Sequence, residues 1–263
     1  MTHQVSPLGI VGLGALGRAV ETFLRPEQNK TPSAILFTVK AFDLDTALRG
    51  EAAGWPLDIP FVTLSNGYIS PILENLLPVL HPRQIHVGMT TIGSTIGLDG
   101  KVTVFSNNTV TAWGPIGSNF PPPTPGELAR LRLFPNGQWH NDMRPLLRQK
   151  WLFNVVINTL CAVYGLRSNG LLTAHRTEAE DVLCEATELA DLLWKDVPWD
   201  VSGQQELSKQ LWSVITVTSG NENSMVRDLR LKKQTESHYL AGVARNYDGF
   251  EKLKKLHQQI VAR

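Results

Sequence analysis

The sequence predicts an α/β fold in which a Rossmann-like, mostly parallel sheet is followed by an all-helical C-terminal domain. Short apolar runs alternate with helical patterns in the first part of the chain, and a glycine-rich turn, Gly12–Gly17, joins the first run to a helix. The second half shows helical periodicity alone. Strands that alternate with helices are typical of a parallel sheet, so the two halves predict two domains.

The apolar runs define the expected strands, because each is short and bounded by turn residues. We expect buried strands at residues 8–11, 35–39, 61–64 and 85–89, and helices after the glycine turn and at 71–80. Beyond them, residues 102–105 and 109–113 flank Asn107-Asn108. Such a turn predicts an antiparallel hairpin that closes the sheet.

Apolar residues at helical spacing predict helices at 150–163, from Thr177 onward, at 207–218 and at 250–260. Thr177 and Glu180 match a capping box, which would open the second of these. The last helix is basic and amphipathic, and a packed helix with a solvated outer face explains it better than a membrane surface. The change of pattern near Asn141 predicts an α/β domain at 1–141 and a helical domain at 142–263.

Composition excludes several classes of protein. Hydrophobic residues make up 42% and charged residues 19%, which argues against disorder. The 25 Lys and Arg and 24 Asp and Glu leave a formal net charge of +1, so neither nucleic acid nor a membrane is an expected partner. Cys161 and Cys184 have no metal-ligand spacing and form no disulfide framework. Without a signal-like N-terminus or a long apolar run, we expect a soluble, cytoplasmic protein without a metal.

The glycine turn is the first candidate binding site. Gly12, Leu13, Gly14, Ala15, Leu16 and Gly17 follow a strand and open a helix. Glycines there permit a tight turn, so a pyrophosphate can approach the free N–H groups of the helix N-terminus. Such turns also serve packing alone, but the strand–turn–helix context favours dinucleotide binding.

Two polar residues follow the next strands. Lys40 comes after the strand at 35–39, and Asn66 comes after the strand at 61–64. Either residue alone is ordinary in a loop. In doubly wound sheets, however, ligands bind beyond the carboxyl ends of the strands, so the three strand ends together favour one dinucleotide groove.

Lys150, Asn154 and Asn158 recur at four-residue spacing and therefore share one face of a helix. A charged helix start followed by two tolerated amides is the simple interpretation. The surrounding residues are strongly apolar, and a buried amide without a partner costs about 1–3 kcal/mol. The stripe therefore favours a polar cleft. Ser224 and Glu236 flank a basic segment, and alone they would be a loop hydroxyl and a surface carboxylate.

Together these motifs resemble the ketopantoate reductase (2-dehydropantoate 2-reductase) family. The similarity runs through the glycine turn and seven further segments: Thr38-Val39-Lys40-Ala41, Ser65-Asn66-Gly67, Gly88-Met89-Thr90-Thr91, Trp139-His140-Asn141, Lys150 to Asn158, Ser224-Met225-x2-Asp228 and Thr235-Glu236. The ordered Lys/Asn/Asn helix followed by Ser and Glu is more specific than the glycine turn.

The resemblance implies NADPH-dependent reduction of a branched 2-oxo acid to a 2-hydroxy acid, as in pantothenate biosynthesis. Carried over by position, Lys150 is the general acid and Glu236 the second catalytic residue, which binds substrate or the nicotinamide ribose. Asn154, Asn158 and Ser224 would bind the substrate. Lys40, Asn66 and the glycine turn would bind NADP, and assembly as a homodimer is left open.

One departure from the family is large. Only one helix and one loop fit between Gly12 and Ile35, where the family has further strands, including the one whose end carries the basic residue for the NADP 2′-phosphate. Thr31-Pro32-Ser33 stands where an acidic residue would bind an NAD ribose, and Arg18, Arg25 and Lys30 are the cations in reach. Two alternatives stay open: a related dehydrogenase for another small oxo or hydroxy acid, and a non-catalytic, reductase-derived ligand-binding protein.

Overall fold

The computed structural model describes most of the chain, and the described residues form two compact units. The first unit contains residues 1–65 and 69–143, and the second contains residues 66–68 and 144–263. The described residues are 8–12, 14–24, 34–52, 55, 59–76, 80, 85–96, 99–104, 110–116, 126, 134, 136–200 and 203–263.

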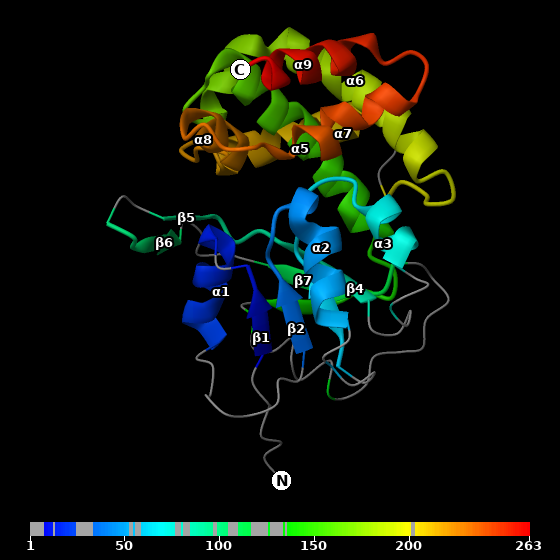
Figure 1. Ribbon diagram of the computed structural model, residues 1–263. Coiled ribbons are helices and arrows are strands. Elements are labelled where there is room, and N and C mark those ends of the chain that lie inside the picture. The colour runs from blue at the N-terminus through cyan, green and yellow to red at the C-terminus, as the bar shows by residue number, and fades with distance from the viewer. Residues whose placement is uncertain are drawn as a thin grey trace. The chain divides into compact units, whose positions relative to one another are not determined.

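The first unit is built on a six-stranded, mostly parallel sheet with the order β1-β2-β3-β4-β7-β8 (Figure 1). Its strands are β1 Leu8–Val11, β2 Ala34–Phe37, β3 Phe61–Thr63, β4 Ile85–Thr90, β7 Thr111–Gly114 and β8 Gly137–Trp139. The first four pair in parallel, in chain order, and β7 runs antiparallel to β4. Within the described sheet β1 is an edge strand, which confirms the expected loss of the strands beyond it.

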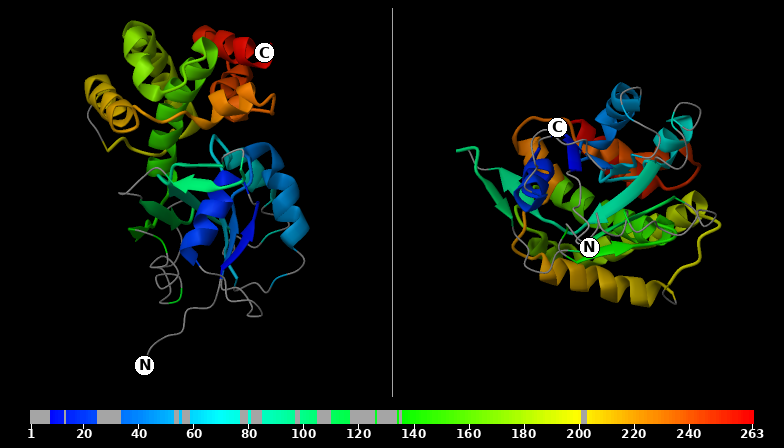
Figure 2. Two further views of the ribbon diagram at one scale, coloured as in Figure 1. Left: turned by 90° about the vertical axis from the view of Figure 1, so that its left-hand side faces the viewer. Right: turned by 90° about the horizontal axis from the view of Figure 1, so that it is seen from below.

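Helices lie on both sides of this sheet. They are α1 Ala15–Leu24, α2 Ala41–Ala52 and α3 Ser70–Leu76. α1 packs its Ala19 and Val20 against Leu36 and Val62 of the strands, and Figure 2 shows α1 and α2 on opposite sides of β1 and β2. The sequence gives little sign of α2, because charged residues interrupt its apolar positions.

The predicted antiparallel hairpin is wrong. β6 Val102–Val104 pairs antiparallel with β5 Ser94–Ile96 in a separate two-stranded sheet, whereas β7 lies between β4 and β8. All four residues of β7 are buried, while those of β6 are half-buried or exposed. The two apolar runs therefore belong to different sheets. Asn107-Asn108 lies outside the described residues.

The second unit is helical, as predicted, in every element described after Met143. α5 Arg144–Tyr164 is its central helix: almost every residue from Trp151 to Val163 is buried, against α6, α8 and α9 among others (Figure 1). No helix in the described part of the chain is long and apolar enough to span a bilayer. The remaining elements are η2 Asn169–His175, α6 Arg176–Leu193, α7 Gln204–Val217, α8 Ser224–Arg230, η3 Glu236–Tyr239, η4 Ala241–Asn246 and α9 Glu251–Val261.

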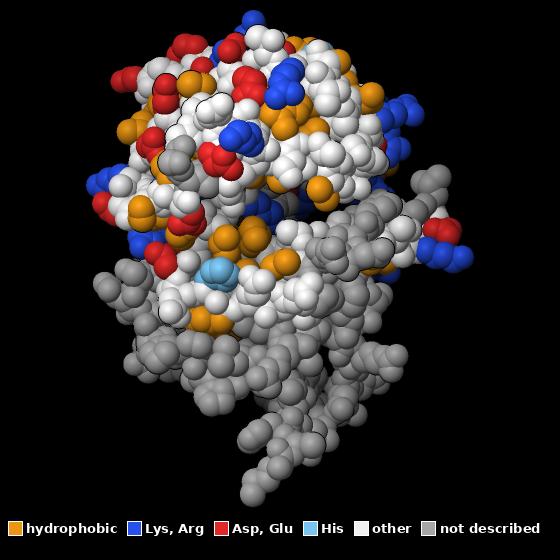
Figure 3. All heavy atoms as spheres, turned by 180° about the vertical axis from the view of Figure 1, so that it is seen from behind, with side chains coloured by type: hydrophobic (Ala, Val, Ile, Leu, Met, Phe, Trp, Pro, Cys, Tyr) orange, Lys and Arg blue, Asp and Glu red, His pale blue; other side chains and the backbone are white. Residues whose placement is uncertain are grey.

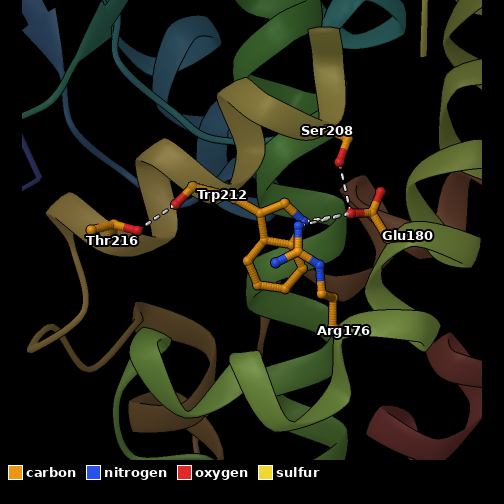
Figure 4. A network of polar contacts seen from close by, with 5 residues as sticks. All are labelled: Arg176, Glu180, Ser208, Trp212 and Thr216. Carbon is orange, nitrogen blue, oxygen red and sulfur yellow. Dashed lines mark hydrogen bonds and ion pairs between the residues drawn. The ribbon is translucent and has the colours of Figure 1, made fainter. Parts of the chain in front are cut away.

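The predicted capping box at Thr177 is also wrong. Because η2 runs directly into α6, Thr177 lies inside a continuous helical stretch, and the N-cap position falls on His175. Glu180 instead accepts hydrogen bonds from Ser208 Oγ at 2.7 Å and Trp212 Nε1 at 2.5 Å, both on α7 (Figure 4). The carboxylate joins two helices and does not cap one.

Candidate active site

The glycine turn adopts a shape that side chains would prevent. Gly12 has φ +95°, and a Cβ there would lie 2.7 Å from Val39 Cγ1. A Cβ on Gly17 would lie 2.0 Å from the Gly12 oxygen, whereas a Cβ on Gly14 would meet nothing within 4 Å. The Thr38 hydroxyl donates a hydrogen bond to the Gly12 carbonyl. The backbone of Gly12 therefore packs closely against Val39, and the backbone of Gly17 packs against that of Gly12. Helix α1 begins at Ala15.

This geometry fits the pyrophosphate of a dinucleotide, since Gly14, just before α1, is exposed and a Cβ there would meet nothing within 4 Å. Ala15 and Leu16 begin the helix as expected, and Arg18 is exposed on it. Leu13, Arg25, Lys30 and Thr31-Pro32-Ser33 lie outside the described residues.

The next two strand ends are joined by a side chain. Ser65 Oγ donates to the Val39 carbonyl at 2.7 Å, so the residue before Asn66 is bonded to the residue before Lys40. Lys40 is half-buried, and its carbonyl accepts from the Asp43 N–H at the start of α2. Asn66 is half-buried and belongs, with Gly67 and Tyr68, to the helical unit.

Lys150, Asn154 and Asn158 lie on one stripe of α5, as their spacing predicts. Asn158 is 9% exposed, and Lys150 and Asn154 are partly buried. Burial lowers the pKa of Lys150 to about 8, and the negative charge of Glu236 opposes this shift. The lysine and the glutamate therefore interact within the helical unit, although they are far apart in sequence.

Glu236 is buried, at 4% exposure, so it is not the surface carboxylate that its sequence context alone suggested. It opens η3, where Thr235 Oγ1 accepts from the Ser237 N–H. At the other end of η3, the Tyr239 carbonyl accepts from Trp151 Nε1 at 3.0 Å and from the Tyr68 N–H at 2.8 Å. Trp151 follows Lys150 on α5, so η3 is bonded to the helix that carries the lysine.

Ser224 is the exposed first residue of α8 and not a loop hydroxyl. Asn223 caps this helix by accepting from the Val226 N–H at 3.0 Å, and its side chain is hydrogen-bonded to Cys161, one turn beyond Asn158 on α5. Asn223 Nδ2 also donates to Asn169 Oδ1 at 3.5 Å. These contacts set the start of α8 beside the end of the asparagine stripe.

Several supporting residues were not identified from the sequence. Asn223 could have been found, because asparagine is a preferred N-cap residue. Arg148 could not: its guanidinium is buried, donates to the carbonyls of Val197 and Pro198, and lies 3.6 Å over the Trp199 ring. Nothing in the local pattern distinguishes it from a surface arginine.

On the face in Figure 3, the helical unit carries Lys and Arg interspersed with Asp and Glu.

Comparisons with known proteins find similarity to ketopantoate reductases. Residues 142–247 match the family model described as "Ketopantoate reductase PanE/ApbA C terminal". The 2-dehydropantoate 2-reductase of Shigella flexneri is 28% identical over 222 residues, which is 82% of this chain and 68% of that enzyme. The corresponding enzyme of Yersinia pestis is 23% identical over 89% of this chain and 85% of its own.

Solved structures share the fold. D-mandelate dehydrogenase in complex with NADH has a TM-score of 0.79 and 17% identity, over 97% of this chain and 98% of that chain. A PanE/ApbA family ketopantoate reductase from Ralstonia eutropha JMP134 has a TM-score of 0.77 and 15% identity, over 97% of both chains.

Proposed function

The chain resembles the ketopantoate reductases, and from this premise we propose that it catalyses NADPH-dependent reduction of 2-dehydropantoate, a branched 2-oxo acid, to the 2-hydroxy acid pantoate. The family resemblance supports an oxidoreductase with a nicotinamide nucleotide as cofactor. We assign cofactor binding to residues 1–141 and substrate binding and catalysis to residues 142–263. The observation that carries the proposal is the Lys150–Glu236 pair beside the asparagine stripe.

Lys150 is the proposed proton donor. A pKa of about 8 leaves its ammonium mostly protonated at neutral pH while making the proton easier to transfer than from an ordinary lysine. It would polarise the keto oxygen and then protonate that oxygen as the carbon becomes tetrahedral. Asn154, Asn158 and Ser224 supply amide and hydroxyl groups for the substrate's carboxylate and hydroxyl, and Glu236 orients Lys150 and binds substrate or ribose.

The bound nicotinamide would supply the hydride that reduces the keto carbon. The cradle at Gly12 and Gly17, which a Cβ would fill, supports diphosphate binding at the start of α1. Lys40 and Asn66 follow the neighbouring strands, and we propose that they contact the same cofactor.

The edge position of β1 supports a second candidate, a ligand-binding protein that has lost cofactor affinity together with the strands beyond β1. One experiment separates the two. The purified protein is mixed with 2-dehydropantoate, other 2-oxo acids, and NADPH or NADH, and oxidation of the cofactor is followed by absorbance. We expect turnover with 2-dehydropantoate. Binding of a 2-oxo acid without oxidation of either cofactor would overturn the reductase in favour of the second candidate.

A further inference from the structure

We propose that Ser237 and His257 form a positioning pair that holds Glu236 against Lys150, an inference that rests on the proposed roles of those two residues. Ser237 Oγ and His257 Nδ1 lie 2.7 Å apart, and the two residues are 1% and 2% exposed. His257 lies on α9, at the far end of the chain from α5. Neither group can exchange this hydrogen bond for one to bulk water, so the contact fixes the serine in one place.

The serine transmits this constraint because η3 is short. Glu236 and Ser237 are consecutive residues of a four-residue 3₁₀ turn, so fixing the backbone of Ser237 also fixes the backbone of Glu236. A Cβ on Gly242 would lie 2.9 Å from His257 Cε1 and 2.9 Å from the Ser237 oxygen. The imidazole therefore packs closely against the backbone of Gly242, which also lies close to the Ser237 carbonyl.

The opposite end of η3 is fixed to the lysine helix. Trp151 Nε1 donates to the Tyr239 carbonyl, and Trp151 follows Lys150 directly. η3 is thus bonded to α9 through Ser237 and to α5 through Tyr239. With both ends bonded, the carboxylate of Glu236 keeps the position from which it acts on Lys150.

The charge state of His257 is consistent with this structural role. Burial lowers its pKa to about 4, with smaller contributions from His238 and Arg245. The His238 ring packs edge-on against it at 4.6 Å. A neutral imidazole at physiological pH has one nitrogen that accepts and one that donates, so it can bond a hydroxyl without bringing a buried positive charge near the site.

The test is the pKa of Lys150 in the full-length protein, measured by NMR titration of ¹³C-labelled lysine and assigned with Lys150→Arg. Ser237→Ala should lower this pKa below about 8, because a displaced Glu236 no longer offsets the effect of burial. Ser208→Ala is the matched control, since it also removes a serine hydroxyl bonded at 2.7 Å, but in the α6–α7 network of Figure 4. It should leave the Lys150 titration unchanged.

Two histidine variants sharpen the result. His257→Asn keeps a polar atom near the Nδ1 position and should retain the wild-type Lys150 pKa, whereas His257→Leu should behave like Ser237→Ala. We expect kcat of Ser237→Ala to fall about 10- to 100-fold if the carboxylate is displaced. An unchanged Lys150 pKa in folded Ser237→Ala would overturn the inference. Since the titration needs no turnover, it decides the matter even if the wild type reduces no 2-oxo acid, and Ser237→Ala suffices if His257→Leu does not fold.

Discussion

The helical unit and the sheet unit differ in how much of the proposed reductase site each one carries. In the helical unit, Lys150, Asn154, Asn158, Ser224 and Glu236 all lie on described helical elements fixed by buried contacts. In the sheet unit, the glycine turn keeps its geometry, but β1 is an edge strand with no described strand beyond it. On the proposed assignment, chemistry depends on the helical unit and cofactor affinity on the sheet unit, so substitutions should affect one and spare the other.

The largest expected effect is on the helical side. Lys150→Ala should reduce kcat by roughly 10²- to 10⁴-fold, because it removes the proposed general acid. The dissociation constant of the reduced cofactor should change little. Steady-state kinetics with 2-dehydropantoate and a fluorescence titration of cofactor measure the two quantities.

Lys209→Ala is the control for this substitution, since that ammonium is exposed and pairs with Glu206 at 3.2 Å. It should leave kcat unchanged. Near-wild-type kcat in Lys150→Ala would remove this lysine as the proton donor.

In the sheet unit we expect the opposite pattern, in which a substitution affects cofactor binding. Gly17→Ala places a Cβ 2.0 Å from the Gly12 oxygen and must distort the turn, whereas Gly50→Ala, on the exposed surface of α2, adds a Cβ in open space. We expect Gly17→Ala to weaken cofactor binding on the order of 10²-fold, the equivalent of about 3 kcal/mol. Gly50→Ala should bind the cofactor as tightly as wild type. Equal affinities in the two variants, by fluorescence titration, would contradict the assignment of the cradle.

The two units also differ in what the sequence could predict. The four parallel strands and the α5 stripe were predicted because buried strands and amphipathic helices have their own periodicity. The pairing of β7 with β4 was not, because it depends on contacts distant in sequence, and the antiparallel hairpin predicted instead is wrong. For the same reason the burial of Glu236 and its bonded neighbours could not be read from the local pattern around Thr235. The family resemblance identified Glu236, and the structure supplied the contacts that position it.

The pH dependence of kcat examines the helical unit on its own. Lys150 must be protonated to act, so kcat should fall about tenfold per pH unit above its pKa of about 8. Glu236→Gln removes the charge that raises this pKa, and the decline should then begin at lower pH. The same pKa shift affects stability. Between pH 8 and 10.5 Lys150 is protonated to a greater extent in the unfolded chain than in the folded chain, so the free energy of unfolding should rise with pH over that range. A pH profile that does not move in Glu236→Gln would contradict the pairing.

Cofactor preference examines the sheet unit. Charge-assisted hydrogen bonds to a 2′-phosphate contribute about 1.5–3 kcal/mol each, and the described sheet has no strand beyond β1, where the family resemblance would put their donor. We therefore expect NADPH and NADH to differ by no more than about tenfold in dissociation constant at fixed salt. A residual preference for NADPH would come from Arg18, which is exposed on α1. A preference for NADPH of about a thousandfold would show that another basic pocket replaces the lost one.

The smallest effect should come from the cap of α8, which tests how finely the helical unit positions Ser224. Asn223→Ala removes the acceptor for the Val226 N–H and should cost about 1 kcal/mol in the free energy of unfolding. Asn223→Asp keeps that acceptor and adds a favourable charge at a helix N-terminus, so it should cost less. Urea denaturation measures both. Because α8 carries Ser224, KM for the 2-oxo acid should rise in Asn223→Ala by a few-fold, with kcat nearly unchanged. The side chain of Asn223 also donates a hydrogen bond to Asn169, which an aspartate cannot do. If KM rises equally in both variants, this bond, rather than the cap, sets the position of Ser224.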